Sequence, residues 1–388
     1  MVSLSDLASY PICRRCAGRI FAMVGTGLTN LERGSMLEFS IKCEKNDPEF
    51  NFADPQNCEI CHGIFDKFSV FLSLVEDKLK EIEYSTFVVG SVFPKEWIEL
   101  ENKIQEAFGA HGESIKKEFN REFGKYITAK TGKEYRKEDP DITIAVNVEY
   151  EFVNVSIKSL FIYGKYRKYR RDMPQTRWIH KKDGDSIESI IGEAALRIAG
   201  GKNYYLHGSG REDVDVRMLG NGREFVIEVE APIMRTFDLS ILSETVNRSM
   251  KGVEIFDLSF VDRKTVKEIK EEKHSKVYDC IIEGDTDIDK LKLEEACTEM
   301  NGKNIYQRTP LRVAQRRSDL IRTRKIERME LVAVEGKEAE IVVQAEAGTY
   351  IKELISGDSG RTNPSLSSKY GSQLNVKELD VIKICRGE

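Results

Sequence analysis

The sequence predicts an α+β protein of more than one domain, and three observations support this. With 388 residues, the chain is long enough for two or three domains that each bury a core. Segments of alternating apolar residues, typical of strands, lie between segments whose apolar residues recur every three or four positions, typical of helices. Two Cys-x-x-Cys pairs set the first 62 residues apart. We expect domains at residues 1–62, 63–160 and 161–388.

The composition argues against a membrane protein. Hydrophobic residues make up 40% of the chain and charged residues 32%, which is typical of a globular protein with a charged surface. No stretch approaches the ~20 apolar residues of a membrane span, so we expect no membrane partner. The N-terminus lacks the features of a signal peptide, which predicts the cytoplasm. The net charge of −5 does not exclude nucleic acid, because binding depends on local basic surface.

The first 62 residues carry a candidate metal site. Its four cysteines form two pairs, each able to present two thiolates from one turn: Cys13, Cys16, Cys58 and Cys61. Two such pairs make the closed four-sulfur site that suits Zn²⁺. We expect a structural Zn²⁺ that supplies much of the folding free energy of this module. A redox pair or four free thiols are the alternatives.

The second predicted domain is a small α/β region. Its apolar pattern predicts helices at 64–82, 95–108 and 113–130, and strands at 86–93, 142–148 and 153–157. This order, with Asp-Pro-Asp at 139–141 ahead of the alternating strand, resembles that of a THUMP domain, an RNA-binding module of tRNA-modifying enzymes. The resemblance implies a THUMP-like RNA-binding domain.

A basic and aromatic segment follows at 163–171. It interleaves three tyrosines with five basic residues and contains no acid: Lys165, Arg167, Lys168, Arg170 and Arg171. Cationic side chains neutralise phosphates, and tyrosine rings stack on exposed bases. The segment, extended by 175–178, therefore predicts an RNA contact. The alternative is a solvated charged face.

Charge is densest at the start of a predicted β-hairpin. Five charged residues fall within seven positions: Arg211, Glu212, Asp213, Asp215 and Arg217. Apolar residues then alternate with polar ones, Asn221-Gly222 is typical of a tight hairpin turn, and 225–229 follows as a second strand. Such density is costly without specific partners. One hypothesis is a solvated hairpin, and the other is a carboxylate presented to a ligand.

The remaining chain alternates helices and strands. We expect helices at 186–199, 263–273 and 288–299, and strands at 252–261, 277–282 and 339–347. Residues 308–328 hold eight basic residues against two acids, which on a helix would form a second track for phosphates or a solvated face. Lys352 precedes a loop rich in Gly, Ser and Pro. Its ammonium would keep a nearby carboxylate ionised and in place.

Three segments, in this order, are similar to the tRNA pseudouridine synthases of the Pus-ten type from archaea and eukaryotes. They are GREDVDVRMLGNGR at 210–223, RTPLRVAQRR at 308–317, and AGTYIKEL at 347–354 continued by GDSGRT at 357–362. The resemblance covers roughly residues 150–388. It implies a C-terminal catalytic domain built on a mixed, largely antiparallel sheet.

The resemblance also implies roles for individual residues. Asp213 is expected to be the catalytic carboxylate with Lys352 as its cationic partner, while Tyr278 stacks on the target base and Ile351 packs beneath it. Arg211 is expected to contact the substrate. Three arginines of the basic segment are expected to bind RNA: Arg312, Arg316 and Arg317.

The implied reaction converts uridines 54 and 55 of the tRNA T arm to pseudouridine. No redox or nucleotide cofactor is expected, since the chain lacks a dinucleotide-binding glycine fingerprint and a phosphate-binding loop. The expected partner is tRNA, and the expected state is a monomer. The alternatives are an inactive zinc-containing tRNA-binding or chaperone protein, and an enzyme with another uridine target such as ribosomal RNA.

Overall fold

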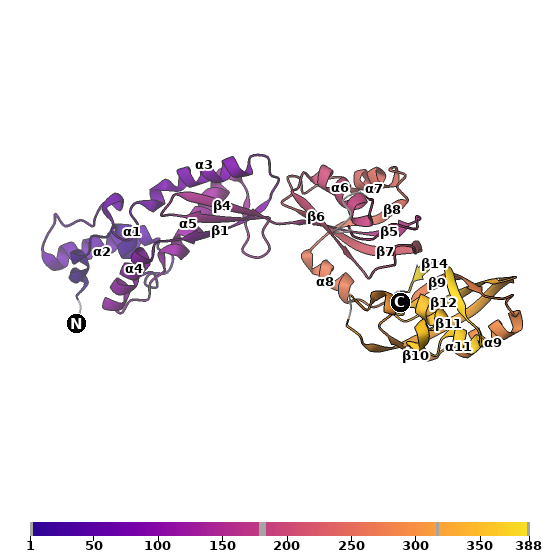
Figure 1. The fold of residues 1–388 in the computed structure, drawn as a ribbon. Helices are drawn as coiled ribbons and strands as arrows, with labels where there is room; N and C mark the ends of the chain where they lie inside the picture. Colours follow the sequence, from indigo (N-terminus) through magenta and orange to yellow (C-terminus); the bar gives the residue numbers. More distant parts are fainter. Residues whose placement is uncertain (1–2, 178–183, 316–317, 386–388) are drawn as a thin grey trace. The chain divides into compact units, whose positions relative to one another are not determined.

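The computed structural model describes residues 3–177, 184–315 and 318–385, which fold into two compact units (Figure 1). The N-terminal unit comprises Met1–Lys158 and Ala231–Arg235, and the C-terminal unit comprises Ser159–Glu230 and Thr236–Glu388. Within the described ranges, no helix is both long and apolar enough to cross a bilayer. The division of the N-terminal part into domains at 1–62 and 63–160 stays a prediction.

The N-terminal unit combines a helical region with a small sheet. Its helical elements are η1 (Leu4–Ser9), α1 (Arg14–Ile20), α2 (Asn30–Lys45), η2 (Pro55–Asn57), η3 (Ile64–Lys67), α3 (Phe68–Leu79), α4 (Lys95–Ala107) and α5 (Ile115–Thr131). Its strands are β1 (Thr86–Val92), β2 (Glu134–Tyr135), β3 (Ile142–Asn147) and β4 (Phe152–Ile157). The elements predicted between residues 64 and 157 are confirmed, apart from shifts of a few residues at their ends.

The four strands are ordered β2-β1-β3-β4. β1 pairs in parallel with β2 and β3, and β4 pairs antiparallel with β3. Ile142, Ile144 and Val146 are fully buried on one face of β3, as their alternation predicts. Their side chains belong to a hydrophobic core that also holds all four cysteines of the Cys-x-x-Cys pairs. Because this core is continuous, the cysteine site and the sheet form one packed body.

The C-terminal unit contains the larger sheet. Its strands are β5 (Leu160–Lys168), β6 (Asn203–Gly208), β7 (Arg217–Glu230), β8 (Val253–Val261), β9 (Lys276–Gly284), β10 (Asn304–Arg308), β11 (Ile321–Glu335), β12 (Glu338–Ala345), β13 (Thr362–Asn363) and β14 (Leu374–Ile384). Its helical elements are α6 (Ile187–Ala199), α7 (Leu239–Asn247), α8 (Arg263–Glu271), α9 (Lys290–Met300), η4 (Leu311–Val313), α10 (Ile351–Ser356), η5 (Asp358–Gly360) and α11 (Leu366–Tyr370).

The strands of this sheet follow the order β13-β10-β11-β12-β9-β14-β7-β5-β8, and β6 also pairs with β7. The β7–β14 pair is parallel, and the other pairs are antiparallel. This confirms the predicted mixed, largely antiparallel sheet. The β7–β14 pair joins the strands β5–β8 to the strands β9–β13, which brings loops from both halves together near the start of β7.

The predicted hairpin around Asn221-Gly222 is wrong. β7 is one strand of 14 residues that continues through this dipeptide. Gly220 and Gly222 have φ values of 59° and 72°, and a Cβ on Gly220 would lie 1.8 Å from the carbonyl oxygen of Ile382. The two glycines therefore allow β7 to bend at the point where it approaches β14 and then pairs with β5. Asn221 fixes the kink through two hydrogen bonds with the backbone of Ile384.

The helix expected within 308–328 is also wrong. β10 ends at Arg308, the short η4 spans Leu311–Val313, and β11 begins at Ile321. Pro310 restricts the backbone before η4, and the basic residues of 321–328 lie along a strand paired with β10. Arg316, Arg317 and Trp178 lie outside the described residues. The described residues of the basic segment therefore form the end of β10, the short η4 and the start of β11.

Candidate active site

Asp213 lies in the loop between β6 and β7, and the residue before it anchors this loop. The carboxylate of Glu212 is buried. It accepts hydrogen bonds from the hydroxyl of Tyr166 at 2.9 and 3.0 Å and pairs with Nε of Arg223 at 2.8 Å. Burial and the Glu212 charge raise the pKa of Tyr166 well above its usual value, so this tyrosine stays a neutral donor. The contacts of Glu212 thus fix the backbone that leads into Asp213.

A buried ammonium fixes the loop from a second side. Nζ of Lys168 donates to the carbonyl oxygens of Met173 at 2.9 Å, Val214 at 3.0 Å and Asp213 at 3.3 Å. Burial lowers the pKa of Lys168. The side chain is fully buried, so the prediction that Lys168 binds RNA is wrong. All three N–H donors of its ammonium already have acceptors inside the protein.

The carboxylate of Asp213 is half-exposed, with 39% of its side chain accessible. Its nearest cation is Arg312, whose Nη1 lies 3.0 Å from Oδ1 and 2.9 Å from Oδ2. Nζ of Lys352 lies 4.0 Å from Asp213 but 2.6 Å from Asp215. Lys352 is therefore a neighbour of Asp213, as predicted, but the structure gives the direct ion pair to Arg312.

Lys352 and Asp215 form a second ion pair beside the first. Burial acts to raise the pKa of Asp215, but its hydrogen bond and ion pair with Lys352 outweigh burial and lower this pKa. Lys352 lies in the first turn of α10, and Asp215 lies in the turn that precedes β7. Two carboxylates and two cations thus alternate at the point where the two halves of the sheet meet.

Tyr278 and Ile351 contribute apolar surface near this charge cluster. Tyr278 lies on β9, between Val343 and Val381 of the flanking strands, and both Tyr278 and Ile351 belong to the main core of the unit. Burial raises the pKa of Tyr278 to about 12; Arg223 opposes this rise, and Asp213 adds to it. Tyr278 is therefore within electrostatic reach of Asp213, and its hydroxyl stays protonated.

The other basic residues predicted to bind RNA differ in their surroundings. Lys165 pairs with Asp257 at 2.7 Å, and Arg167 pairs with Glu254 at 2.9 Å. Arg171 contacts Glu378 and Asp380, while Arg170 keeps 53% of its side chain exposed. Arg211 is exposed and has no ion pair or hydrogen bond with residues inside the described ranges. Arg211 and Arg170 are thus the most open of this set.

The four cysteines in the N-terminal unit come together as predicted. Their sulfur atoms all lie within 4.8 Å of one another, and all four residues are buried. Sγ of Cys13 is 3.6 Å from Sγ of Cys61, close to the roughly 3.8 Å between sulfurs in tetrahedral coordination at a Zn–S distance of about 2.3 Å. The donor set and its burial fit a structural metal site.

Sequence reasoning missed Arg19, which joins this cysteine site to helices α4 and α5. Arg19 is fully buried. Its guanidinium donates to Sγ of Cys16 at 3.3 Å, to Glu101 at 2.6 Å and to Glu118 at 2.9 Å. The one local signal is the spacing of three residues from Cys16, which places both side chains on one face of α1.

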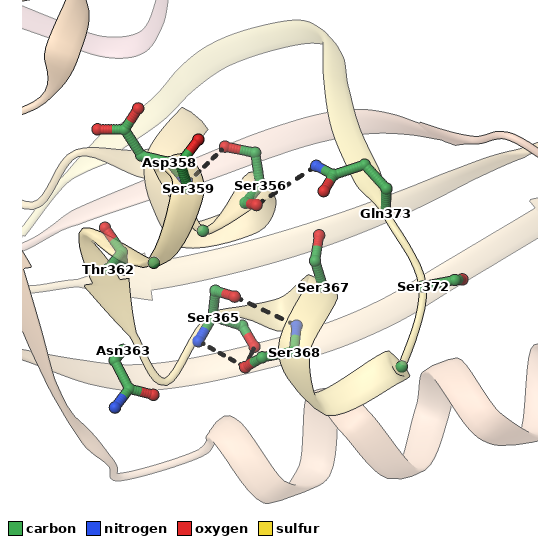
Figure 2. A pocket seen from close by; sticks show the side chains of 13 residues that line it. Ser356, Asp358, Ser359, Thr362, Asn363, Ser365, Ser367, Ser368, Ser372 and Gln373 are labelled. Carbon is green, nitrogen blue, oxygen red and sulfur yellow. Dashed lines mark hydrogen bonds between the residues drawn. The ribbon is translucent and has the colours of Figure 1, made fainter.

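A pocket among the described residues lies elsewhere in the C-terminal unit. Its volume is about 860 Å³, and residues between Ser356 and Gln373 line it. Figure 2 shows these side chains. None of the predicted site residues lines it. Several of its hydroxyl groups bond within the protein, as in the capping box formed by Ser365 and Ser368. The candidate site is therefore assigned to the charge cluster around Asp213.

Comparisons with known proteins identify the family of this chain. The family model "Pus10, C-terminal" matches residues 161–385, and "Pus10 THUMP domain, archaeal" matches residues 71–147. The protein therefore combines a THUMP domain with a Pus10 C-terminal domain. Among solved structures, a Cbf5-Nop10-Gar1 complex aligns at 17% identity with a TM-score of 0.35, covering 57% of this chain and 48% of that chain.

Curated relatives match over nearly the whole chain. "tRNA pseudouridine synthase Pus10" of Thermoplasma acidophilum is 63% identical, and its counterpart in Picrophilus torridus is 50% identical, each over 100% of both chains. The Pyrococcus furiosus protein of the same name is 38% identical over 97% of this chain and 96% of its own. The chain belongs to the Pus10 family of tRNA pseudouridine synthases.

Proposed function

We propose that this protein converts uridines 54 and 55 of the tRNA T arm to pseudouridine, with Asp213 as the catalytic carboxylate. The observation that carries the proposal is the setting of Asp213 in a domain of the Pus10 family. Its side chain is half-exposed on a loop fixed by Glu212 and Lys168, and two cations hold its charge. Such a carboxylate is accessible and fixed in direction.

The reaction breaks the N-glycosidic bond of uridine, turns the uracil and joins its carbon to the same ribose. A carboxylate beside the sugar serves this reaction as a nucleophile or as a base. A uridine within a folded arm must leave its stack to reach the carboxylate. Tyr278 stacks on the flipped base, and Ile351 packs beneath it. Lys352 lowers the pKa of Asp215 and adds positive charge 4.0 Å from Asp213.

Binding of tRNA is assigned to the THUMP domain and to basic residues of the C-terminal unit that were predicted to contact RNA, with Arg211. Arg211 and Arg170 are more exposed than Lys165, Arg167 and Arg171. Lys165, Arg167 and Arg171 reach phosphates by exchanging their present carboxylate partners, and Arg316 and Arg317 extend the basic loop. Phosphate contacts of this kind position the RNA and make binding depend on salt.

A structural Zn²⁺ is assigned to Cys13, Cys16, Cys58 and Cys61. When bound, Zn²⁺ holds four thiolates in a tetrahedron and contributes folding free energy. Arg19 and the surrounding apolar residues orient the ligands and exclude water. We further propose that the protein acts in the cytoplasm as a monomer, without a redox or nucleotide cofactor, and that its domains follow the boundaries 1–62, 63–160 and 161–388.

Position-resolved pseudouridine mapping tests this function. An unmodified tRNA transcript and a ribosomal RNA fragment are incubated separately with purified protein, and tRNA binding is measured in parallel. We expect new pseudouridine at positions 54 and 55 of the tRNA only. Product confined to the ribosomal RNA would change the substrate, and tight tRNA binding without product would favour the inactive binding protein.

A further inference from the structure

Arg312 joins two carboxylates with a single guanidinium group. Its Nη1 contacts both oxygens of Asp213 at 2.9–3.0 Å. On its other side, Nε donates to Oε1 of Glu353 at 2.6 Å, and Nη2 lies 3.4 Å from Oε2. The planar guanidinium presents its donors in a fixed geometry. The orientation of the Asp213 carboxylate is thus linked to that of Glu353.

Glu353 is the buried end of this arrangement. Only 6% of its side chain is exposed, and Arg312 is its one cationic partner in the part of the chain that the structure describes. Moving Arg312 away to a phosphate would leave a buried carboxylate without a counter-charge, which is strongly unfavourable. Asp213 and Arg312 themselves are 39% and 37% exposed. Glu353 therefore retains the arginine while Asp213 remains open to solvent.

The backbone that carries Arg312 is also fixed. The N–H of Leu311 donates to Oδ2 of Asp358 at 3.1 Å. The carbonyl oxygen of Thr309 accepts hydrogen bonds from Arg361 at 2.7 and 3.0 Å. The hydroxyl of Thr309 donates to the carbonyl oxygen of Ser318 at 2.7 Å. An arginine that binds a phosphate of a flexible RNA does not need a fixed backbone. An arginine that orients another side chain does.

We propose that Arg312 is a positioning residue for the reaction, held by Glu353, and that its role is to orient Asp213 and not to bind phosphate. This inference rests on the proposed catalytic role of Asp213. The role differs from the RNA contact predicted from the basic segment at 308–317. Lys352 serves the neighbouring Asp215 more directly, at 2.6 Å, so Asp213 depends on Arg312 for its direction.

The test separates the rate of the chemical step from tRNA affinity. Wild type, Arg312→Gln, Arg312→Lys and Glu353→Gln are compared by single-turnover pseudouridine formation at saturating enzyme and by tRNA Kd, after thermal unfolding shows that each is folded. Arg248→Gln is the matched control, because Arg248 is an exposed arginine directly after α7 that pairs with Glu244 of that helix. We expect this control to change neither quantity.

We expect Arg312→Gln to lower the single-turnover rate by about 30-fold, as for a lost charged hydrogen bond, with Kd within about twofold of wild type. Arg312→Lys keeps the charge but cannot span both carboxylates, so its rate should fall by about 10-fold. Glu353→Gln keeps Arg312 but weakens its anchor, and should lower the rate by about 5-fold.

A phosphate-binding Arg312 gives the opposite pattern. Arg312→Gln would then weaken Kd and reduce its salt dependence with a normal rate at saturation, and Glu353→Gln would strengthen Kd by freeing the arginine. That result, with an active wild type, overturns the inference alone. A wild type that forms no pseudouridine overturns the proposed function and this inference together.

Discussion

Each unit of this protein contains an arginine that joins two carboxylates, and the two arrangements differ in burial. In the N-terminal unit, Arg19 contacts Glu101 and Glu118 and is 0% exposed. In the C-terminal unit, Arg312 contacts Asp213 and Glu353 with 37% of its side chain exposed. The functional groups are the same, while the access of water is not.

The difference separates a structural role from a chemical one. A buried ion pair loses its hydration, so each charge depends on its partners and the removal of one is severe. A half-exposed pair contributes little free energy of folding, but its carboxylate can meet a substrate. Arg19 therefore stabilises the cysteine site against α4 and α5, whereas we propose that Arg312 orients a reactive carboxylate.

The largest effect is expected at the metal site. Cys58→Ser removes one of the four predicted ligands, so bound zinc should be lost together with several kcal/mol of folding free energy. The measurements are metal content by elemental analysis and urea unfolding with and without a chelator. Exposed Cys43→Ser is the control. Unchanged zinc in Cys58→Ser would contradict the four-cysteine site.

Arg19→Met is expected to destabilise the N-terminal unit by about 3–5 kcal/mol, because it leaves Glu101 and Glu118 buried with less counter-charge. Urea unfolding at pH 7 measures this. Arg121→Met is the matched control, since Arg121 also contacts two glutamates but with 44% of its side chain exposed. Equal losses in both variants would remove burial as the distinguishing factor.

Asp380 extends the comparison to a carboxylate whose ion pairs should make the stability of the protein depend on pH. It is a buried carboxylate that contacts Arg217 and lies 2.9 Å from Arg171. Burial acts to raise its pKa, but the two arginines outweigh burial and lower it. A lowered pKa means that the stabilisation is complete above the ordinary aspartate value of about 3.9 and is lost as the pH falls through the folded-state value.

Asp380→Asn should therefore cost about 2 kcal/mol at pH 7 and progressively less below about pH 4. Unfolding by urea at a series of pH values from 7 to 2 measures the difference between wild type and variant. A loss of the same size at every pH would show that the contribution of Asp380 does not depend on its charge.

The smallest effect on stability is expected at Arg312. Arg312→Gln should cost about 1–2 kcal/mol of the free energy of unfolding, because water can hydrate the half-exposed Asp213 and the glutamine amide can still donate to the buried Glu353. The midpoint of urea unfolding measures this directly. A loss as large as that of Arg19→Met would make the two arrangements alike and remove the contrast between them.

The sequence predicts features set by neighbouring residues well, and contacts between residues far apart in the chain poorly. The cysteine pairs were predictable because each is set by a spacing of three residues. Arg19 was missed because its carboxylate partners are 82 and 99 positions away. The Asn221-Gly222 prediction failed because the dipeptide supplies positive φ values to a kink between two partner strands as well as to a hairpin turn.

For Lys168, the strand pattern indicated burial, but the positive charge of the segment was given more weight. Its positive charge suggested RNA binding. The alternation along β5 places Lys168 on the same face as Ile162 and Tyr166, and all three residues are fully buried. The partner of Asp213 was beyond sequence reasoning for another reason. Arg312 and Lys352 lie 99 and 139 residues from it in sequence, and only the folded loops decide which one contacts which carboxylate.

We propose that Asp213, and not the neighbouring Asp215, is the reacting carboxylate. Single-turnover pseudouridine formation on an unmodified tRNA transcript, with Asp213→Asn and Asp215→Asn side by side and tRNA Kd measured for both, tests it most directly. We predict no product from Asp213→Asn at near-normal affinity, and reduced but measurable product from Asp215→Asn, which loses only the ion pair with Lys352. Product from Asp213→Asn together with none from Asp215→Asn would contradict the assignment.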